Sequence, residues 1–271
     1  MRLQNGLMDG SGKPRTIAFI HAHPDDEALL TAGTMAKAHD AGHRVILVMA
    51  TDGAAGLTSS ELSDDLAAHR ATELAASAQV LGTDEVIHLG FSDSGLAGDA
   101  VDGFASANPD SVGAQLAEIL DSRDVDIVVG YDPSGGYGHP DHVQVHHVTR
   151  KAVQQMQRPV TFFEATLPRE PIRDAVHAAA RIRLTPTGFD PGEFDAAWTP
   201  RADITHRINV RKFMRQKMAA LTAHASQAQS DSSTRTLGVL TKLPMPLATA
   251  LLGTEYYVKV DPTSLTNASN S

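Results

Sequence analysis

Short apolar runs alternate with helical patterns over the first 166 residues, and this alternation limits the folds that the chain can adopt. The apolar runs cover residues 16–21, 44–51, 85–89, 126–130 and 160–165, and apolar residues recur at helical spacing over 25–40, 60–81, 111–122 and 140–155. Ser111 is expected to cap the third of these helices. Strands that alternate with helices pair in parallel through right-handed crossovers. The sequence therefore predicts an α/β fold over residues 15–166, with a Rossmann-like, doubly wound, mostly parallel sheet.

The pattern weakens after residue 167. Five prolines between 168 and 200 break the chain into short pieces, whereas a strand pattern at 204–210, a helical pattern at 211–225 and a strand at 254–260 return further on. We expect residues 167–260 to form a smaller C-terminal α+β subdomain that covers the active site. The polar ends are predicted to be a flexible N-terminus, residues 1–14, and a disordered tail, residues 261–271.

Composition excludes several classes of function. The formal net charge of -9 disfavours affinity for nucleic acid or anionic membranes, which need clustered Lys and Arg. No apolar run approaches the ~20 residues of a membrane span, and no signal-peptide segment is visible at the start, so a cytoplasmic location is expected. The chain has no cysteine, so a metal ion must be held by His and carboxylate side chains. A small-molecule partner fits this composition, and a homo-oligomer is left open.

Two motifs carry most of the chemistry, HAHPDDE at residues 21–27 and GHPDH at 138–142. Each follows a predicted strand, and the carboxyl ends of parallel strands meet at one edge of the sheet. His23, Asp26 and His142 would supply two imidazoles and one carboxylate, a set that leaves a zinc ion with an open position for water. Asp25 is then a candidate general base. A single HxxD or HxxH also fits an ordinary turn or helix cap, but the occurrence of both motifs favours a metal site.

These motifs resemble the two signatures of the LmbE-like or PIG-L-type zinc-dependent N-deacetylases, which act on N-acetylglucosamine-type sugars. The resemblance extends to residues 51–53, to the Arg70-x-x-Glu73 pair and to residues 91–95, and it covers roughly residues 15–165. It implies a metal-dependent hydrolase that removes an N-acetyl or N-acyl group from an amino-sugar conjugate. One Zn²⁺ per chain is expected, and Fe²⁺ or Co²⁺ remain alternatives.

The resemblance also assigns a role to each matching residue. It makes His23, Asp26 and His142 the zinc ligands and Asp25 the base that activates water. It implies that His139 stabilises the oxyanion and protonates the leaving amine, that Asp141 holds the His139 imidazole, that Tyr137 adds an oxyanion contact, and that Arg70 and Asp93 bind sugar hydroxyls.

The segment AHASQ, residues 223–227, resembles the AHxTQ segment of the actinobacterial mycothiol-pathway deacetylase and amidase, with Ser226 in place of threonine. His224 is expected either to approach the active site or to pack as an ordinary helix-face histidine. Two other functions stay open: an amidase of a larger mycothiol-type or other N-acyl conjugate, and a non-catalytic, metal-bound sugar-binding protein. The first strand is not followed by GxGxxG, which disfavours a nucleotide-binding protein, and the absence of GxSxG disfavours a serine hydrolase.

Overall fold

The structure is a computed structural model that describes residues 13–53, 63–98, 100, 102–183, 189–224, 235–261 and 265. Most of the predicted flexible N-terminus and of the predicted disordered tail lies outside these residues. So does most of the AHASQ segment, of which only Ala223 and His224 are described.

A seven-stranded sheet runs through the molecule in the order β3-β2-β1-β4-β5-β7-β6. Its parallel part is formed by the five predicted strands, β1 (Thr16–His21), β2 (Arg44–Thr51), β3 (Glu85–Phe91), β4 (Ile127–Tyr131) and β5 (Thr161–Thr166). At the centre, Phe19 of β1 pairs with Leu47 of β2 and with Val129 of β4. The prediction of an α/β fold with a mostly parallel sheet is confirmed.

Two further strands make the sheet mixed. β7 (Thr254–Val260) pairs antiparallel with β5, and β6 (His206–Asn209) pairs antiparallel with β7. The C-terminal strands therefore extend the same sheet that holds β1.

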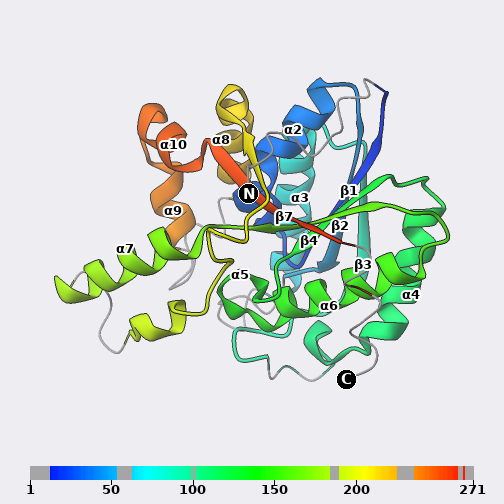
Figure 1. Cartoon of the computed structure of the whole chain (residues 1–271), viewed down its shortest axis with the longest axis horizontal. Helices are drawn as coiled ribbons and strands as arrows, with labels where there is room; N and C mark the ends of the chain where they lie inside the picture. Colours follow the sequence, from blue (N-terminus) through cyan, green and yellow to red (C-terminus); the bar gives the residue numbers. More distant parts are fainter. Residues whose placement is uncertain are drawn as a thin grey trace.

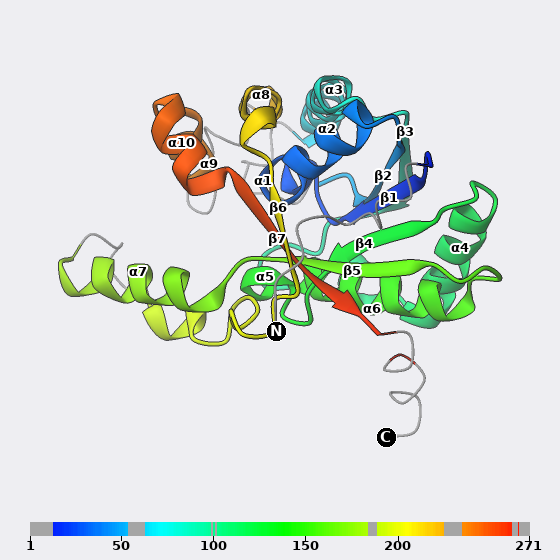
Figure 2. The same ribbon diagram turned by 45° about the horizontal axis from the view of Figure 1, so that its top comes forward.

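Helices cover both faces of the sheet (Figures 1 and 2). One face packs against α2 (Ala32–Asp40), α3 (Ser63–Leu81) and α8 (Met214–Ala223), and the other against α4 (Pro109–Asp121) and α6 (Pro140–Gln155). Alternate residues of β1 enter the two cores: Phe19 lies in the core with Met35, whereas Ile20 lies in the core with Leu116. Burial on both faces explains why β1 reads as a continuous apolar run rather than an alternating one.

The predicted helix over 25–40 is two helices, α1 (Asp26–Leu30) and α2, because the backbone leaves helical geometry at Thr31 (φ -130°, ψ -2°). The Thr31 hydroxyl lies 2.8 Å from His21 Nε2, which ties this break to the end of β1. The prediction of Ser111 as a helix cap is wrong. Asn108 caps α4 instead, since its side chain accepts hydrogen bonds from the amides of Asp110 and Ser111.

The prolines after residue 167 do not prevent a long helix. α7 (Arg169–Arg181) has Pro168 at its N-cap and Pro171 in its first turn, where the missing amide hydrogen is not needed. Figure 2 shows α7 projecting away from the sheet. The remaining short helices are η1 (Phe104–Ser106), α5 (Gly135–Gly138), η2 (Pro191–Phe194), η3 (Arg211–Phe213), α9 (Arg235–Thr241) and α10 (Met245–Leu252). None of the helices within the described ranges is both long enough and apolar enough to cross a membrane.

Candidate metal centre

The two motifs meet at the carboxyl edge of the parallel strands. β1 ends at His21, and the chain turns through His23 into α1; β4 ends at Tyr131, and the chain turns through α5 into α6. His23 Nδ1 lies 3.2 Å from His142 Nε2 and 3.4 Å from Asp26 Oδ2. His142 Nε2 lies 3.3 Å from the same Asp26 oxygen. The structure therefore brings the three predicted ligand atoms into a nearly equilateral triangle.

These spacings fit a tetrahedral ion. Ligand atoms about 2.0–2.1 Å from a tetrahedral zinc ion stand about 3.3 Å from one another. The three side chains are also shielded from water, with His142 2% exposed. Two imidazole nitrogens and one carboxylate oxygen form a donor set that suits Zn²⁺ and other first-row divalent ions.

Other acidic and imidazole groups crowd the same point. The ligand atoms of His23, His139 and His142 lie within 4.8 Å of one another, as do those of His23, Asp93 and Asp141. His23 belongs to both groups and to the predicted triad. The triad is favoured because its three atoms have the tetrahedral spacing and because the remaining nitrogen of each imidazole has a partner of its own.

These partners fix the orientation of the two imidazole rings. His142 Nδ1 lies 3.2 Å from the Gly135 carbonyl, which can only accept, so Nδ1 donates and Nε2 is left with a lone pair. His23 Nε2 lies 3.1 Å from Asp141 Oδ2 and 3.6 Å from Asp93 Oδ1. Carboxylates that contact the outer nitrogen of an imidazole orient it and raise its basicity.

Asp141 differs from its expected role of holding His139. Its Oδ2 contacts His23 and accepts a hydrogen bond from the Ser94 amide at 2.9 Å, and its Oδ1 is buried without a hydrogen-bond partner among the described residues. The carboxylate therefore supports the ring of His23, and the contact between Asp141 and His139 runs through the Asp141 backbone instead.

His139 is the N-cap of α6. Its Nδ1 accepts a hydrogen bond from the Asp141 amide at 3.2 Å, so the neutral ring carries its proton on Nε2. Burial, followed by the charges on His23 and His142, lowers the pKa of His139 to about 4. The ring centroid lies 4.6 Å from that of His23 and 4.9 Å from that of His142. A neutral N–H donor thus stands beside the triad.

Tyr137 lies at the open side of the cluster. Its side chain is 44% exposed, and its ring centroid lies 5.2 Å from that of His142 and 6.2 Å from that of His139. The Tyr137 ring therefore lies against both imidazoles and is also accessible to solvent.

Asp25 occupies an unusual backbone conformation. Its φ of 120° falls in a region that residues other than glycine rarely adopt. Burial and the neighbouring Asp26 raise the pKa of Asp25 to about 8, because both disfavour a second negative charge. A cation held by Asp26 would oppose that effect and favour the carboxylate form.

Arg70 and Asp93, the predicted substrate-binding residues, both border the cluster. Arg70 is only 4% exposed. Its pKa is lowered, because burial outweighs the opposite effect of the nearby Asp25 and Asp93 carboxylates. Asp93 Oδ1 accepts a hydrogen bond from the Gly95 amide at 2.8 Å. Burial acts to raise the pKa of Asp93, but hydrogen bonding to His23 lowers it to about 2. Both groups are therefore charged at neutral pH.

The turn before α6 contains residues that the motifs do not reveal. Asp132 is fully buried, and its Oδ1 accepts hydrogen bonds from the Ser134 and Gly136 amides at 3.0 Å. Its Oδ2 accepts from Thr166 and from Thr199. Asp132 thereby holds the turn whose Gly135 carbonyl orients His142. The Asp-Pro-Ser-Gly sequence, a common turn pattern, is the signal that indicates this role.

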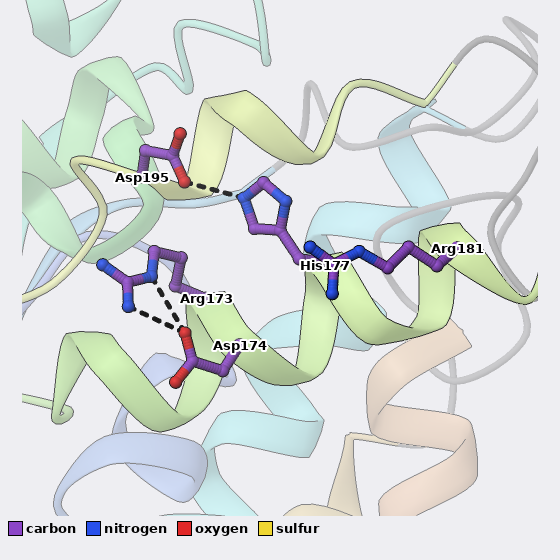
Figure 3. Close-up of a pocket in the computed structure, with 5 residues that line it drawn as sticks. All are labelled: Arg173, Asp174, His177, Arg181 and Asp195. Carbon is purple, nitrogen blue, oxygen red and sulfur yellow. Dashed lines mark hydrogen bonds and ion pairs between the residues drawn. The ribbon is translucent and has the colours of Figure 1, made fainter.

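A separate cavity of about 540 Å³ lies along α7, lined by Arg173, Asp174, His177, Arg181 and Asp195 (Figure 3). Arg173 pairs with Asp174 at 2.8 Å, and His177 pairs with Asp195 at 2.8 Å. It contains none of the motif residues, and its charges largely compensate one another.

The chain is an α/β protein. At the carboxyl ends of its parallel strands, the sheet carries a His/carboxylate cluster of the kind that binds a metal ion. The PIG-L family model, described as GlcNAc-PI de-N-acetylase, matches residues 18–153. The chain belongs to this family.

Individual relatives agree with that assignment. The chain is 34% identical over 263 residues to the 1D-myo-inositol 2-acetamido-2-deoxy-alpha-D-glucopyranoside deacetylase of Acidothermus cellulolyticus, covering 90% of this chain and 88% of the relative. It is 35% identical to the protein of the same name from Kineococcus radiotolerans, covering 81% of this chain and 70% of the relative. The N,N'-diacetylchitobiose deacetylase of Pyrococcus horikoshii shares the fold, with a TM-score of 0.61 and 20% identity over 92% of this chain and 85% of that one.

Proposed function

We propose that this protein hydrolyses the N-acetyl group of an N-acetylglucosaminyl conjugate, with an inositol glycoside as the first substrate to test. The single observation that carries the proposal is the triangle of His23, Asp26 and His142 atoms, which lie 3.2–3.4 Å apart. Asp25 directly precedes Asp26 in the chain. The names of the two relatives above support the choice of aglycone.

His23, Asp26 and His142 would hold one divalent ion, with Zn²⁺ as the first choice and Fe²⁺ or Co²⁺ as alternatives. A bound ion of this kind supplies Lewis acidity, which polarises an amide carbonyl and lowers the pKa of water. Asp141 and Asp93 orient the His23 ring, and the Gly135 carbonyl orients the His142 ring.

The chain's own residues would then move the protons. Asp25 accepts a proton from the attacking water as general base. His139 Nε2–H and the Tyr137 hydroxyl donate hydrogen bonds to the oxygen that becomes negative in the tetrahedral intermediate. The amide C–N bond then breaks, and the amine leaves with the proton that Asp25 took from the water, while the neutral His139 ring keeps its Nε2 proton and acts as a hydrogen-bond donor. Acetate and the free amino sugar are the products.

Arg70 and Asp93 would bind sugar hydroxyls, since a cation and a carboxylate at the border of the cluster complement hydroxyl acceptors and donors. We assign residues 15–166 to a Rossmann-like catalytic core and residues 167–260 to a smaller part that covers it. The sequence pattern supports this division, since strands and helices alternate up to residue 166, and β7 and β6 join the smaller part to the core by continuing its sheet beyond β5. A cytoplasmic location completes the proposal.

Acetate release tests the function. Chelator-stripped protein would be incubated with N-acetylglucosamine, its inositol glycoside and N,N'-diacetylchitobiose, with and without Zn²⁺, Fe²⁺ or Co²⁺. We expect release only with metal and fastest with the inositol glycoside. No release from any of the three by protein shown to contain one metal ion per chain would contradict the proposal. Release from a larger N-acyl conjugate alone would instead identify an amidase.

A further inference from the structure

Glu27, the last acidic residue of the first motif, lies at the centre of a buried network that the proposed chemistry does not use. Its Oε1 accepts a hydrogen bond from Ser77 Oγ at 2.5 Å and lies 2.7 Å from His224 Nε2. Its Oε2 accepts from the backbone amide of Asp25 at 3.0 Å. Glu27 and His224 are both fully buried. Three distant parts of the chain, α3, the end of α8 and the first motif, therefore meet on one carboxylate.

The Asp25 amide is where this network reaches the site. A φ of 120° is unfavourable for an aspartate and persists only where surrounding contacts impose it. The hydrogen bond to Glu27 Oε2 is such a contact. Since Asp25 is the proposed base, the conformation that Glu27 holds also sets the direction in which the Asp25 carboxylate points.

His224 completes the network from the C-terminal part of the chain. It follows α8 directly, at the C-cap position, where it is 197 residues from Glu27 in sequence. Burial by itself lowers the pKa of His224, but the Glu27 and Asp25 carboxylates raise it to about 9. The contact itself is geometric: His224 Nε2 donates to Glu27 Oε1, and His224 Nδ1 is buried without a hydrogen-bond partner among the described residues.

We propose that His224 and Glu27 are positioning residues for the general base: His224 fixes Glu27, and Glu27 fixes the backbone of Asp25. This inference rests on the proposed function of Asp25. It gives residues after α8 a part in catalysis without contact with the metal or the substrate. His224 of the AHASQ segment therefore packs inside the fold and acts on the site through Glu27.

A second buried network offers a matched control. Glu255 of β7 accepts hydrogen bonds from the Thr34 hydroxyl at 2.6 Å and from Lys217 at 2.6 Å, and the Tyr257 hydroxyl donates to Thr34 at 2.8 Å. It also joins C-terminal elements to the first helices. Among the described residues, the hydrogen-bond partners of Glu255 do not include Asp25, so loosening this network should affect stability alone.

The experiment compares His224→Leu, the conservative His224→Gln and the milder Ser77→Ala with the control Tyr257→Phe, all loaded with metal. We expect His224→Leu to keep one metal per chain and to lower kcat about 10- to 100-fold with KM within twofold, since misplacement by about 1 Å can cost 10²-fold. His224→Gln, which keeps a donor for Glu27, should recover part of the rate. Ser77→Ala should lower kcat less than His224→Leu, and Tyr257→Phe should keep kcat within twofold.

A double-mutant cycle separates positioning from general loosening. In an Asp25→Asn background there is no base left to position, so His224→Leu should reduce the residual rate by less than twofold. An equal loss in both backgrounds would overturn the proposal, as would an unchanged kcat in His224→Leu or a comparable loss in Tyr257→Phe.

Crystal structures of the variants give a readout that does not depend on turnover. The φ of Asp25 should move away from 120° in His224→Leu and stay there in Tyr257→Phe. If the wild-type protein releases no acetate, the proposed function fails, whereas an unchanged Asp25 backbone in His224→Leu would overturn the positioning role itself.

Discussion

Asp25 and Asp26 are adjacent carboxylates with different surroundings. Asp26 lies against both imidazoles, and the hydrogen bonds and charges of His142 and His23 hold its pKa well below the usual range although burial acts in the opposite direction. Asp25 is half-buried beside that negative charge and has a raised pKa. One residue is thus suited to bind a cation and the other to accept a proton.

This difference predicts different losses from the same isosteric change. Asp25→Asn should retain one metal ion per chain and lower turnover about 10²- to 10⁴-fold, the usual contribution of a general base. Asp26→Asn should lose both metal and turnover. Metal analysis after dialysis, together with acetate release, checks the pair. Full turnover in metal-loaded Asp25→Asn would remove Asp25 as the base.

At this scale the sequence predicted the cluster better than the contacts within it. The spacing of the motifs was enough to predict that His23, Asp26 and His142 converge, because the carboxyl ends of parallel strands share one edge. The position of the Asp141 carboxylate against His23 depends on the Ser94 amide, which comes from a loop after β3. No local pattern specifies such a long-range contact.

The turn before α6 is the element on which the second motif depends. Gly135 and Gly136 have φ values of 57° and 72°. A Cβ on Gly136 would lie 2.5 Å from the Trp198 ring. The backbone amide of Trp198 donates a hydrogen bond to the Gly136 carbonyl at 2.7 Å. Trp198 therefore packs directly on the turn that carries Tyr137 and the Gly135 carbonyl.

Gly136→Ala should destabilise the protein by about 1–3 kcal/mol, because it adds a steric clash to an unfavourable φ. Gly42→Ala is the matched control: Gly42 has a φ of 79° but no atom within 4 Å of its Cβ position. Urea unfolding should show a larger loss of the free energy of unfolding for Gly136→Ala than for Gly42→Ala. When Trp198→Ala is combined with Gly136→Ala, it should lower the free energy of unfolding little further. Equal losses at the two glycines would show that contact with Trp198 contributes nothing.

Elements with strong local patterns were predicted well, and the failures have physical causes. β1, β2, α6 and β7 have the predicted bounds. α7 was missed because its prolines read as breaks, yet both fall where a helix tolerates them. The pairing of β7 with β5 was not predictable, because it joins strands about 90 residues apart whose register no turn specifies.

For the whole molecule, the buried pair of Lys217 and Glu255 holds the C-terminal part to the core. Their side chains are each 2% exposed and 2.6 Å apart, and Glu255 also accepts from the amides of Gly33 and Thr34 at the start of α2. Lys217→Met should reduce the free energy of unfolding by about 3–5 kcal/mol, because it leaves a buried carboxylate without its cation. Lys212→Met, on the exposed side of η3, should change it by less than about 0.5 kcal/mol in the same urea titration. Similar losses would mean that the pair contributes little.

Metal binding should stabilise the whole fold, since the three proposed ligands come from two segments that are far apart in sequence and are brought together only in the folded chain. An ion at 100 times its Kd adds about 2.7 kcal/mol, and for a chain of this size that raises the Tm by roughly 5–10 °C.

Both imidazoles must be unprotonated to bind, so protons compete with the ion. Burial lowers the pKa of His23, but hydrogen bonds to Asp141, Asp26 and Asp93 raise it well above its usual value. The rise in Tm on adding Zn²⁺ to stripped protein should therefore shrink as the pH falls, and the decline should begin above the usual titration range of histidine. Calorimetry at several pH values tests this, with His23→Ala as the control that should show little rise at any pH. A zinc-dependent rise that is as large in His23→Ala as in the wild type would place the metal elsewhere, because two of the three donors cannot hold the ion as tightly as the complete triad.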